Sequence, residues 1–374
     1  MRMRYVIAVL ILLSACSGKE QNDPDNPGLN VSLERVQSIY EDPDNENSFM
    51  SNIRFLDADE AGNVYMYSGQ RNVIMKYLAD GSFDRIIGGP GEGPGEYSDV
   101  TMMHVRGDSL YIFSRDTQRL LVYDLEGVSY NAIQAGSNLS YPVLQPTGYG
   151  YAGFHSNSWF TDEDHAIGHV YDHTLRSQHE DMLMISAFYP GMVEQTLNVL
   201  AGSGPLNVVM LDDYTALAAP IVYRGQIYEL SYDTTSGQWV KSDSMRSFEA
   251  GKLYEEVPRS SKQNDMSFIG PGMEEPANYR YLSRSNRLFI TDEEDIVNFT
   301  YRDEGDRRDF GVEVFDANYN YLGFDTLETD PLYGDDEFIY FDTPDAYKNG
   351  KFYRSSYDRD QGISFVEVLE LSIE

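Results

Sequence analysis

Histidine side chains are the densest set of candidate metal ligands in this chain. Five of its six histidines fall within residues 155–179, and a zinc site needs three or four such ligands converging on one ion. His165, His169 and His173 are spaced four apart, but four residues along a strand span roughly 13 Å, too far for one ion to bridge. No cofactor is therefore predicted. The alternative is a divalent metal held by His155 and His165, which both fall on expected loops.

Two acidic clusters, residues 42–46 and 292–295, raise calcium as another candidate metal. The first begins like an EF-hand loop. It has no glycine at the sixth position, however, and it carries Ile53 where the twelfth position requires glutamate. We interpret both clusters as solvated acidic loops.

The glycine-rich segment of residues 88–96 could form an anion-binding nest, because successive backbone N–H groups can point at one phosphate. It lacks the Gly-Lys-Ser/Thr ending of a P-loop, and no helix is expected after it. We interpret it as a connection between two structural repeats.

Arginines and aromatic residues recur in the loop between the second and third strands of a repeated unit. Planar guanidinium groups suit carboxylates and phosphates, and exposed aromatic rings stack on sugars or other rings. Where such units are arranged around a common axis, these loops share one face, around the central opening. We expect them to bind a ligand there through Arg71, Arg115, Trp159, Tyr223, Arg224, Arg302 and Arg359. The alternative is that the arginines pair with neighbouring acids such as Asp116 or Asp358.

A repeat with a period of 46 residues positions these loops. Sliding the sequence by 46 places residues 62–68 (GNVYMYS) over residues 108–114 (DSLYIFS), and the same shift superimposes Tyr77 on Tyr123 and Gly81 on Gly127. Each unit reads as four short strands separated by turns, expected in the first unit at residues 53–58, 64–67, 73–77 and 83–87. Four strands in every 40–50 residues are typical of a propeller blade.

Later units are looser, but their third strands still end in an aromatic residue followed by an acid. This pattern predicts six blades, with an insertion at about residues 242–278 and seven blades as the alternative. The last blade has only three strands of its own, expected at residues 337–341, 352–357 and 363–371. We therefore predict that an N-terminal strand, residues 31–40 (VSLERVQSIY), is its fourth strand and closes the ring.

The first residues read as an export signal. Arg2 and Arg4 precede a short apolar run at residues 5–13, which is too short to span a bilayer as a mature helix. Residues 13–16 (LSAC) resemble the lipobox of bacterial lipoproteins, in which cleavage precedes a cysteine that is then acylated. We expect a signal peptide at residues 1–15, a lipidated flexible tether at 16–30 and a propeller domain at 31–374. An ordinary signal peptide is the alternative.

Composition excludes some partners. The formal net charge is −33, which argues against nucleic acid, because nonspecific binding depends on Lys and Arg neutralising phosphates. Cys16 is the only cysteine, so the chain cannot form an intramolecular disulfide.

Residues 116–127 (DTQRLLVYDLEG) resemble an NHL repeat, in which a loop is followed by Arg-Ile-x-Val-Phe-Asp and a glycine turn. Residues 81–97 resemble the glycine-rich junction between blades of the same family. With the cysteine motif, the chain is similar to the six-bladed, NHL-repeat-like propeller lipoproteins common in Bacteroidota. The resemblance is closest over the first two blades. The resemblance implies the six-bladed propeller fold and export of the protein, and the matching residues include no catalytic motif.

We therefore expect an all-β, six-bladed propeller held in the cell envelope by acyl chains, palmitate among them, on Cys16. Ser17 favours the outer membrane, on its periplasmic or its outer side. The propeller face is expected to bind a protein, a small molecule or a glycan without catalysis. One alternative is a metal-dependent enzyme of the propeller lyase or lactonase kind. The other is a structural subunit of an envelope complex, docking through residues 242–278.

Overall fold

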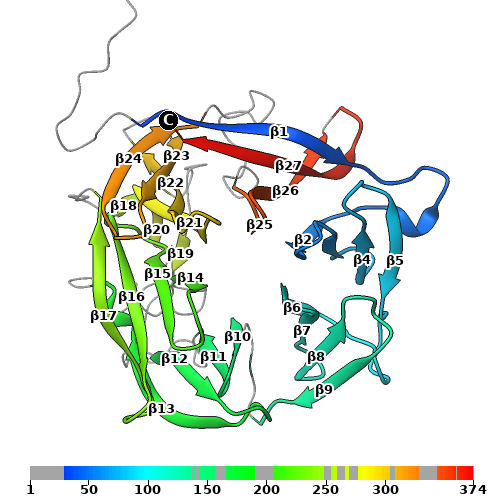
Figure 1. Ribbon diagram of the computed structural model, residues 1–374, viewed down its shortest axis with the longest axis horizontal. Coiled ribbons are helices and arrows are strands. Elements are labelled where there is room, and N and C mark those ends of the chain that lie inside the picture. Colours follow the sequence, from blue (N-terminus) through cyan, green and yellow to red (C-terminus); the bar gives the residue numbers. More distant parts are fainter. Residues whose placement is uncertain are drawn as a thin grey trace, which may run out of the picture.

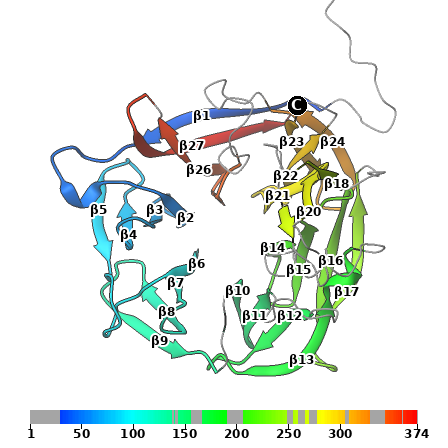
Figure 2. The ribbon, with the colours of Figure 1, turned by 180° about the vertical axis from the view of Figure 1, so that it is seen from behind.

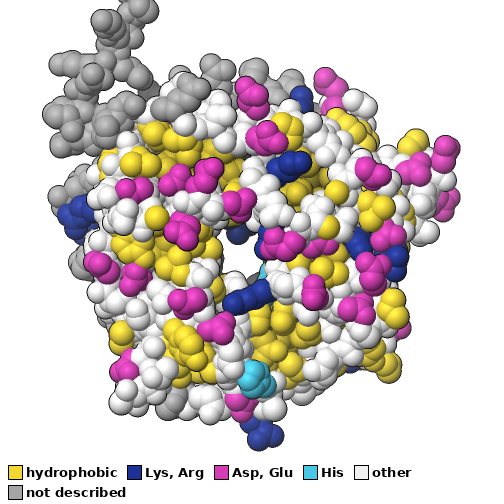
Figure 3. All heavy atoms as spheres, viewed as in Figure 1, with side chains coloured by type: hydrophobic (Ala, Val, Ile, Leu, Met, Phe, Trp, Pro, Cys, Tyr) yellow, Lys and Arg dark blue, Asp and Glu magenta, His cyan; other side chains and the backbone are white. Residues whose placement is uncertain are grey.

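The structure is a computed structural model that describes residues 29–136, 139, 143–155, 166–189, 206–247, 254–258, 266–268, 277–303, 308–327, 343–358 and 360–373. Six four-stranded antiparallel sheets are arranged as blades around a central axis (Figures 1 and 2). The space-filling view shows an opening at the centre of the ring (Figure 3). The predicted all-β, six-bladed propeller is confirmed.

The first three blades follow the chain in order, each with its innermost strand first. Their alternating apolar strands are separated by Gly, Asn and Asp turns. Blade 1 consists of β2 (Ile53–Ala58), β3 (Val64–Ser68), β4 (Val73–Tyr77) and β5 (Phe83–Ile87). Blade 2 consists of β6 (Val100–Arg106), β7 (Ser109–Ser114), β8 (Arg119–Asp124) and β9 (Tyr130–Gln134). Blade 3 consists of β10 (Leu144–Thr147), β11 (Gly150–Phe154), β12 (Ala166–Tyr171) and β13 (Ser177–Met184).

Blades 4 and 5 repeat the same order on either side of a smaller sheet. Blade 4 consists of β14 (Leu206–Met210), β15 (Thr215–Pro220), β16 (Gln226–Asp233) and β17 (Gln238–Arg246). Blade 5 consists of β21 (Ser283–Ile290), β22 (Ile296–Asp303), β23 (Arg308–Phe315) and β24 (Tyr321–Thr326). Between them, β18 (Tyr254–Val257), β19 (Met266–Phe268) and β20 (Ala277–Tyr281) form a three-stranded sheet.

The first and the last described strands meet in blade 6, where the first strand completes the last sheet. β1 (Val31–Ile39) pairs antiparallel with β27 (Ile363–Ile373), which in turn pairs with β26 (Lys351–Asp358). Figure 1 shows β1 lying along β27. The predicted closing strand is confirmed, and it removes a free edge that would otherwise be open to pairing with another chain.

One strand of blade 6 differs from the expectation. Its innermost strand is β25 (Ala346–Lys348), a short strand formed around the Asn349-Gly350 turn. The strand expected at residues 337–341 lies outside the described residues.

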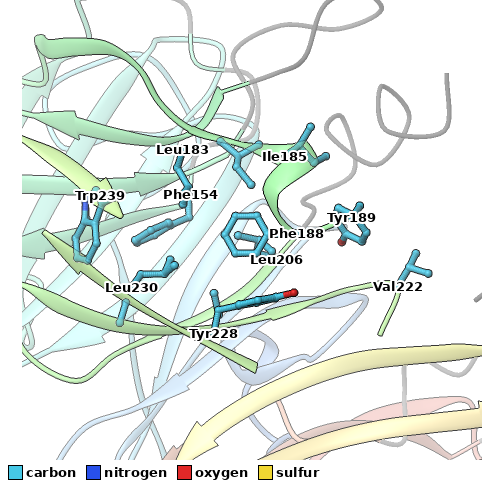
Figure 4. Packing of buried hydrophobic residues seen from close by; sticks show 14 of the residues in the cluster. Phe154, Leu183, Ile185, Phe188, Tyr189, Leu206, Val222, Tyr228, Leu230 and Trp239 are labelled. Carbon is cyan, nitrogen blue, oxygen red and sulfur yellow. The ribbon is translucent and has the colours of Figure 1, made fainter. Parts of the chain in front are cut away.

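The hydrophobic core lies between neighbouring blades. In the largest cluster, Phe154 of β11 packs edge-on against Trp239 of β17, with ring centroids 5.3 Å apart. Phe188 packs in the same way on Tyr228, at 5.2 Å (Figure 4). Because each blade buries both faces against its neighbours, the fold is stable only as a closed ring.

The glycine-rich segment joins β5 of blade 1 to β6 of blade 2, as the sequence predicted. Two of its N–H groups are used internally, since Gly91 donates to the Tyr97 carbonyl and Gly93 donates to the Glu96 carboxylate. Gly88 has a φ of +62°, and a Cβ there would lie 2.7 Å from the Tyr123 hydroxyl, so this position requires glycine.

The expected signal peptide and most of the expected tether, residues 1–28, lie outside the described residues. In the part of the chain that the structure describes, no helix has the length and apolar character to cross a membrane.

Candidate functional site

The antiparallel blades give the ring two distinct ends. The loops between second and third strands and the connections between blades lie at one end, which we call the loop face. The turns between first and second strands, and between third and fourth strands, lie at the other end, which we call the turn face. The sequence placed the expected ligand site at the loop face.

Arg71, on the loop face, is used to hold the chain in place. Its guanidinium donates to the backbone carbonyls of Asn47 at 3.0 Å and Phe49 at 3.1 Å. These carbonyls belong to the segment that leads from β1 into blade 1. Arg71 therefore stabilises the entry to the first blade.

Two more of the expected ligand-binding arginines form ion pairs within the protein. Arg115 pairs with Asp99, at the connection into blade 2. Arg302 pairs with Glu313 on the neighbouring strand, and the Glu313 side chain is fully buried. Arg115 and Arg302 therefore follow the alternative expectation, in which the arginines pair with acids. Their partners are Asp99 and Glu313, however, and not Asp116 or Asp358.

The remaining expected residues differ in their surroundings. Tyr223 is fully buried between blades 4 and 5, and this burial raises the pKa of its hydroxyl well above the usual value. Arg224 is exposed and forms no ion pair with a described residue. Trp159 and Arg359 lie outside the described residues. Ligand binding at the loop face stays a prediction.

His155, one of the two expected metal ligands, has both ring nitrogens in contact with other groups. Its Nδ1 lies 3.4 Å from the Val143 backbone nitrogen, which donates to it, and its Nε2 lies 3.2 Å from the Tyr171 hydroxyl. His165 lies outside the described residues. Within the described segments, no three His, Cys, Asp or Glu side chains are grouped so that they could hold a metal ion.

The acidic cluster at residues 42–46 forms a capped turn. The Asn45 side chain accepts from the Asn47 N–H at the start of a short 3₁₀ helix, η1 (Glu46–Ser48). The Asp42 carboxylate accepts from the Asp44 N–H at 3.0 Å. These contacts agree with a solvated loop.

A pocket of about 610 Å³ opens at the turn face, between blades 4, 5, 6 and 1. Its size suits a small organic ligand. Most of its lining comes from turns that the sequence analysis did not single out. The lining residues are Glu60, Val209, Met210, Leu211, Ile290, Asp292, Glu294, Ile296, Ala317, Tyr319, Tyr347, Lys348 and Asn349.

Hydrogen bonds hold the pocket's two tyrosines in place. The Tyr319 hydroxyl donates to the Glu229 carboxylate of blade 4. The Tyr347 hydroxyl accepts from the backbone N–H groups of Asp292 at 3.0 Å and Gly350 at 3.2 Å. Each tyrosine therefore joins blade 5 to a neighbour, and the pocket wall is preformed.

Among the described residues that line the pocket, the one cation is neutralised by a neighbour. Lys348 Nζ lies 3.1 Å from the Glu60 carboxylate, and the Asn349 side chain donates to the Glu60 carbonyl. Asp292 and Glu294 are both exposed, and neither forms an ion pair with a described residue. Two uncompensated carboxylates therefore lie at the pocket.

The surrounding turns add further negative charge. The pKa of Asp295 is raised, first by burial and then by repulsion from Glu293 and Asp316. Burial raises a carboxyl pKa without any neighbouring charge, so only the repulsion from Glu293 and Asp316 indicates a negative potential around Asp295.

The inner strands beside the pocket also carry titratable groups. Burial raises the pKa of Asp57 on β2 to about 6, although its carboxylate accepts from the Val105 N–H of blade 2 at 2.7 Å. Arg106 pairs with Asp213 of blade 4 at 3.2 Å. Both contacts join blades around the axis, so we assign them to the scaffold.

The sequence does not indicate this pocket, because nothing in the repeat distinguishes one set of turns from another. Of its lining segments, only the acidic run at residues 292–295 stands out in the sequence, where it predicts a solvated loop. The apolar residues of the wall follow ordinary strand patterns. A pattern of exposed apolar and acidic residues at the first turn of several blades would have been the usable signal.

Comparisons with known proteins support the fold. A family model, DUF5128, described as a 6-bladed beta-propeller, matches residues 46–248, more than half of the 374 residues. No curated protein matches the chain.

Two solved structures from Bacteroides share the architecture. A presumed exported protein of Bacteroides fragilis has 12% identity and a TM-score of 0.53, with 92% of this chain and 95% of that chain covered. A member of the duf4221 family from Bacteroides vulgatus has 8% identity and a TM-score of 0.55, with 93% and 100% covered. At these identities the likeness shows a shared fold and nothing about a ligand.

Proposed function

The chain belongs to the DUF5128 family of six-bladed β-propellers, and from this premise we propose that it is an exported, membrane-anchored binding protein. In this proposal the acyl chains are carried on Cys16, and the turn face holds a small ligand in its pocket. The observation that carries the binding role is the preformed pocket of about 610 Å³ among four blades.

Export and anchoring are supported by the amino-terminal sequence. Arg2 and Arg4, the apolar run at residues 5–13 and the LSAC motif together match a lipoprotein signal. The Bacteroides fragilis structure of the same fold is likewise described as a presumed exported protein. Two acyl chains on one cysteine would anchor the domain stably to a bilayer.

Replacing Cys16 with serine is expected to move the protein from the membrane fraction to the soluble fraction of the envelope, because serine has no thiol to acylate. Fractionation of cells fed an alkyne-labelled palmitate analogue measures both location and acylation. Ser17→Ala is the matched control and should keep the protein in membranes and labelled. If the Cys16→Ser protein stays in membranes, the anchoring proposal is wrong.

Binding is supported by the make-up of the pocket wall. Aliphatic side chains at the end of β14 and on β21 provide apolar surface, while carboxylates and the Asn349 amide provide polar groups that can orient a ligand. The tyrosine contacts between blades fix this wall before any ligand arrives, which lowers the entropic cost of binding.

Filling the pocket is expected to abolish binding. Compounds that raise the melting temperature of the wild-type protein should fail to do so in Ala317→Trp, because ligand binding stabilises only the state that can hold it. Ala317 is exposed on the turn after β23 and lines the pocket. Its exposed neighbour Asn318, outside the lining, supplies the control variant Asn318→Trp.

A screen of amines, sugars, alcohols and carboxylic acids of suitable size supplies the compounds. Compounds that bind Ala317→Trp and Asn318→Trp equally well would have their binding site outside the pocket. A complete absence of hits would contradict a small-molecule pocket.

A further inference from the structure

We infer that the pocket at the turn face selects organic cations: an ammonium group carried on an apolar body. This inference rests on the proposed binding function and names the chemical class of its ligand. Three properties of the lining support it: an apolar wall, two tyrosine rings and uncompensated carboxylates.

The apolar wall favours a ligand with a hydrophobic body. Val209, Met210 and Leu211 lie at the end of β14 and in its turn, and Ile290 and Ile296 flank the first turn of blade 5. Leu211 is 41% exposed, so a ligand that covers it gains hydrophobic free energy on binding. A hydrated metal ion or a free polyamine would leave this surface in water.

The two tyrosines favour a positive over a negative ligand group. The face of an aromatic ring attracts ammonium groups and repels anions. Nearby carboxylates strengthen this preference. The pKa of Tyr347 is raised by burial and by the charge of Asp292, and that of Tyr319 by burial and by its hydrogen bond to Glu229.

The charges around the pocket determine whether it favours a positive or a negative ligand. Glu60 and Lys348 neutralise each other at 3.1 Å, which leaves Asp292 and Glu294 without a cationic partner among the described residues. Repulsion from Glu293 and Asp316 contributes to the raised pKa of Asp295 beside them. A ligand carboxylate would add to this repulsion, whereas an ammonium group would relieve it.

The inference is tested with three probes that share a phenyl group and a four-carbon chain and differ in the group at the end of that chain: 4-phenylbutylamine, 4-phenylbutanol and 4-phenylbutanoate. We expect the amine to bind the full-length protein about tenfold more tightly than the alcohol at low salt, by isothermal titration calorimetry, because each exposed ion pair contributes a few-fold. The butanoate should bind most weakly. The preference should shrink in about 0.5 M salt, which screens exposed charges.

Variants localise the effect. Asp292→Asn with Glu294→Gln should bring the amine to the affinity of the alcohol and leave the alcohol unchanged. The control is Glu34→Gln with Glu92→Gln, which removes two exposed carboxylates that do not line the pocket. This control should keep the full preference, so that net charge alone is separated from local charge.

Failure of the inference can be told apart from failure of the proposed function. If alcohol or butanoate binds as tightly as the amine, and Ala317→Trp abolishes that binding, the pocket binds ligands but does not select cations. If the amine preference persists in Asp292→Asn with Glu294→Gln, these two carboxylates are not the cause of that preference. If no probe binds in the pocket of the wild-type protein, both the inference and the pocket's proposed function are wrong.

Discussion

Replacing Arg302 with methionine is expected to lower the free energy of unfolding by about 3–5 kcal/mol, because the change leaves a buried carboxylate without its cation. The Glu313 side chain has no exposed surface. Besides Arg302, it accepts hydrogen bonds from Ser247 at 2.9 Å and from Asn298 at 3.3 Å. These neutral donors cannot replace a guanidinium. Urea unfolding followed by circular dichroism measures the loss.

A double-mutant cycle identifies the cause. Removing both charges, with Arg302→Met and Glu313→Met, should destabilise the protein less than Arg302→Met alone, since no unpaired charge then remains buried. Arg224→Met is the matched control on the same face, because Arg224 is exposed and has no ion pair with a described residue. It should change stability by at most about 0.5 kcal/mol. If Arg302→Met costs as little as Arg224→Met, the buried pair does not hold blade 5 together.

Replacing Glu367 with glutamine is expected to cost about 3 kcal/mol at neutral pH, because a charged acceptor shared by three donors is lost. Glu367 lies on β27 between the two strands that it joins. Its carboxylate accepts from Arg35 of the closing strand β1 at 2.9 Å, and from Arg354 and Ser356 of β26 at 2.8 Å and 2.6 Å. Hydrogen exchange should show the amides of β1 losing protection first.

The effect should depend on pH. Burial by itself would raise the pKa of Glu367, but the charge of Arg354 and the hydrogen bonds from Ser356, Arg354 and Arg35 outweigh it and lower the pKa below its usual value. A lowered pKa means that the carboxylate's contribution is fully present above the unfolded-state pKa of about 4.3 and is lost as the pH falls through the lower folded-state value.

Unfolding measured at several pH values between about 7 and 3 checks this sign. The difference between the wild-type protein and Glu367→Gln should be constant above about pH 5 and should shrink below about pH 4. Glu370→Gln, an exposed position on the same strand, is the control and should show little difference at any pH. A difference that grows on acidification would contradict the proposed role of the Glu367 carboxylate in joining β1, β26 and β27.

These two glutamates occupy equivalent places in neighbouring blades. Glu313 lies in the third strand of blade 5 within Val-Glu-Val, and Glu367 lies in the third strand of blade 6 within the same tripeptide. A charged residue inside an apolar run, repeated in two blades, was a usable sign of a buried ion pair. The end of this strand indicates the number of blades, whereas the ion pair is indicated only by its interior.

Local patterns were enough to predict the strands of the first blades. Residues 53–58, 73–77 and 83–87 were expected as strands, and they match β2, β4 and β5 residue for residue. The reason is that alternation and turn chemistry act within a few residues. Gly81, for example, takes a φ of +88° in the Asp-Gly turn.

The sequence by itself therefore determined the repeat, the six blades and the closing strand. The repeat and the blades follow from periodic patterns, and the closing strand follows because the last blade has only three strands of its own. Only the tertiary structure decided which arginines are used internally and where a pocket forms. Arg71 holds backbone carbonyls 22 and 24 residues away, and Lys348 meets Glu60 across 288 residues. Such contacts depend on which turns the closed ring brings together, and no local sequence pattern predicts which turns will be neighbours.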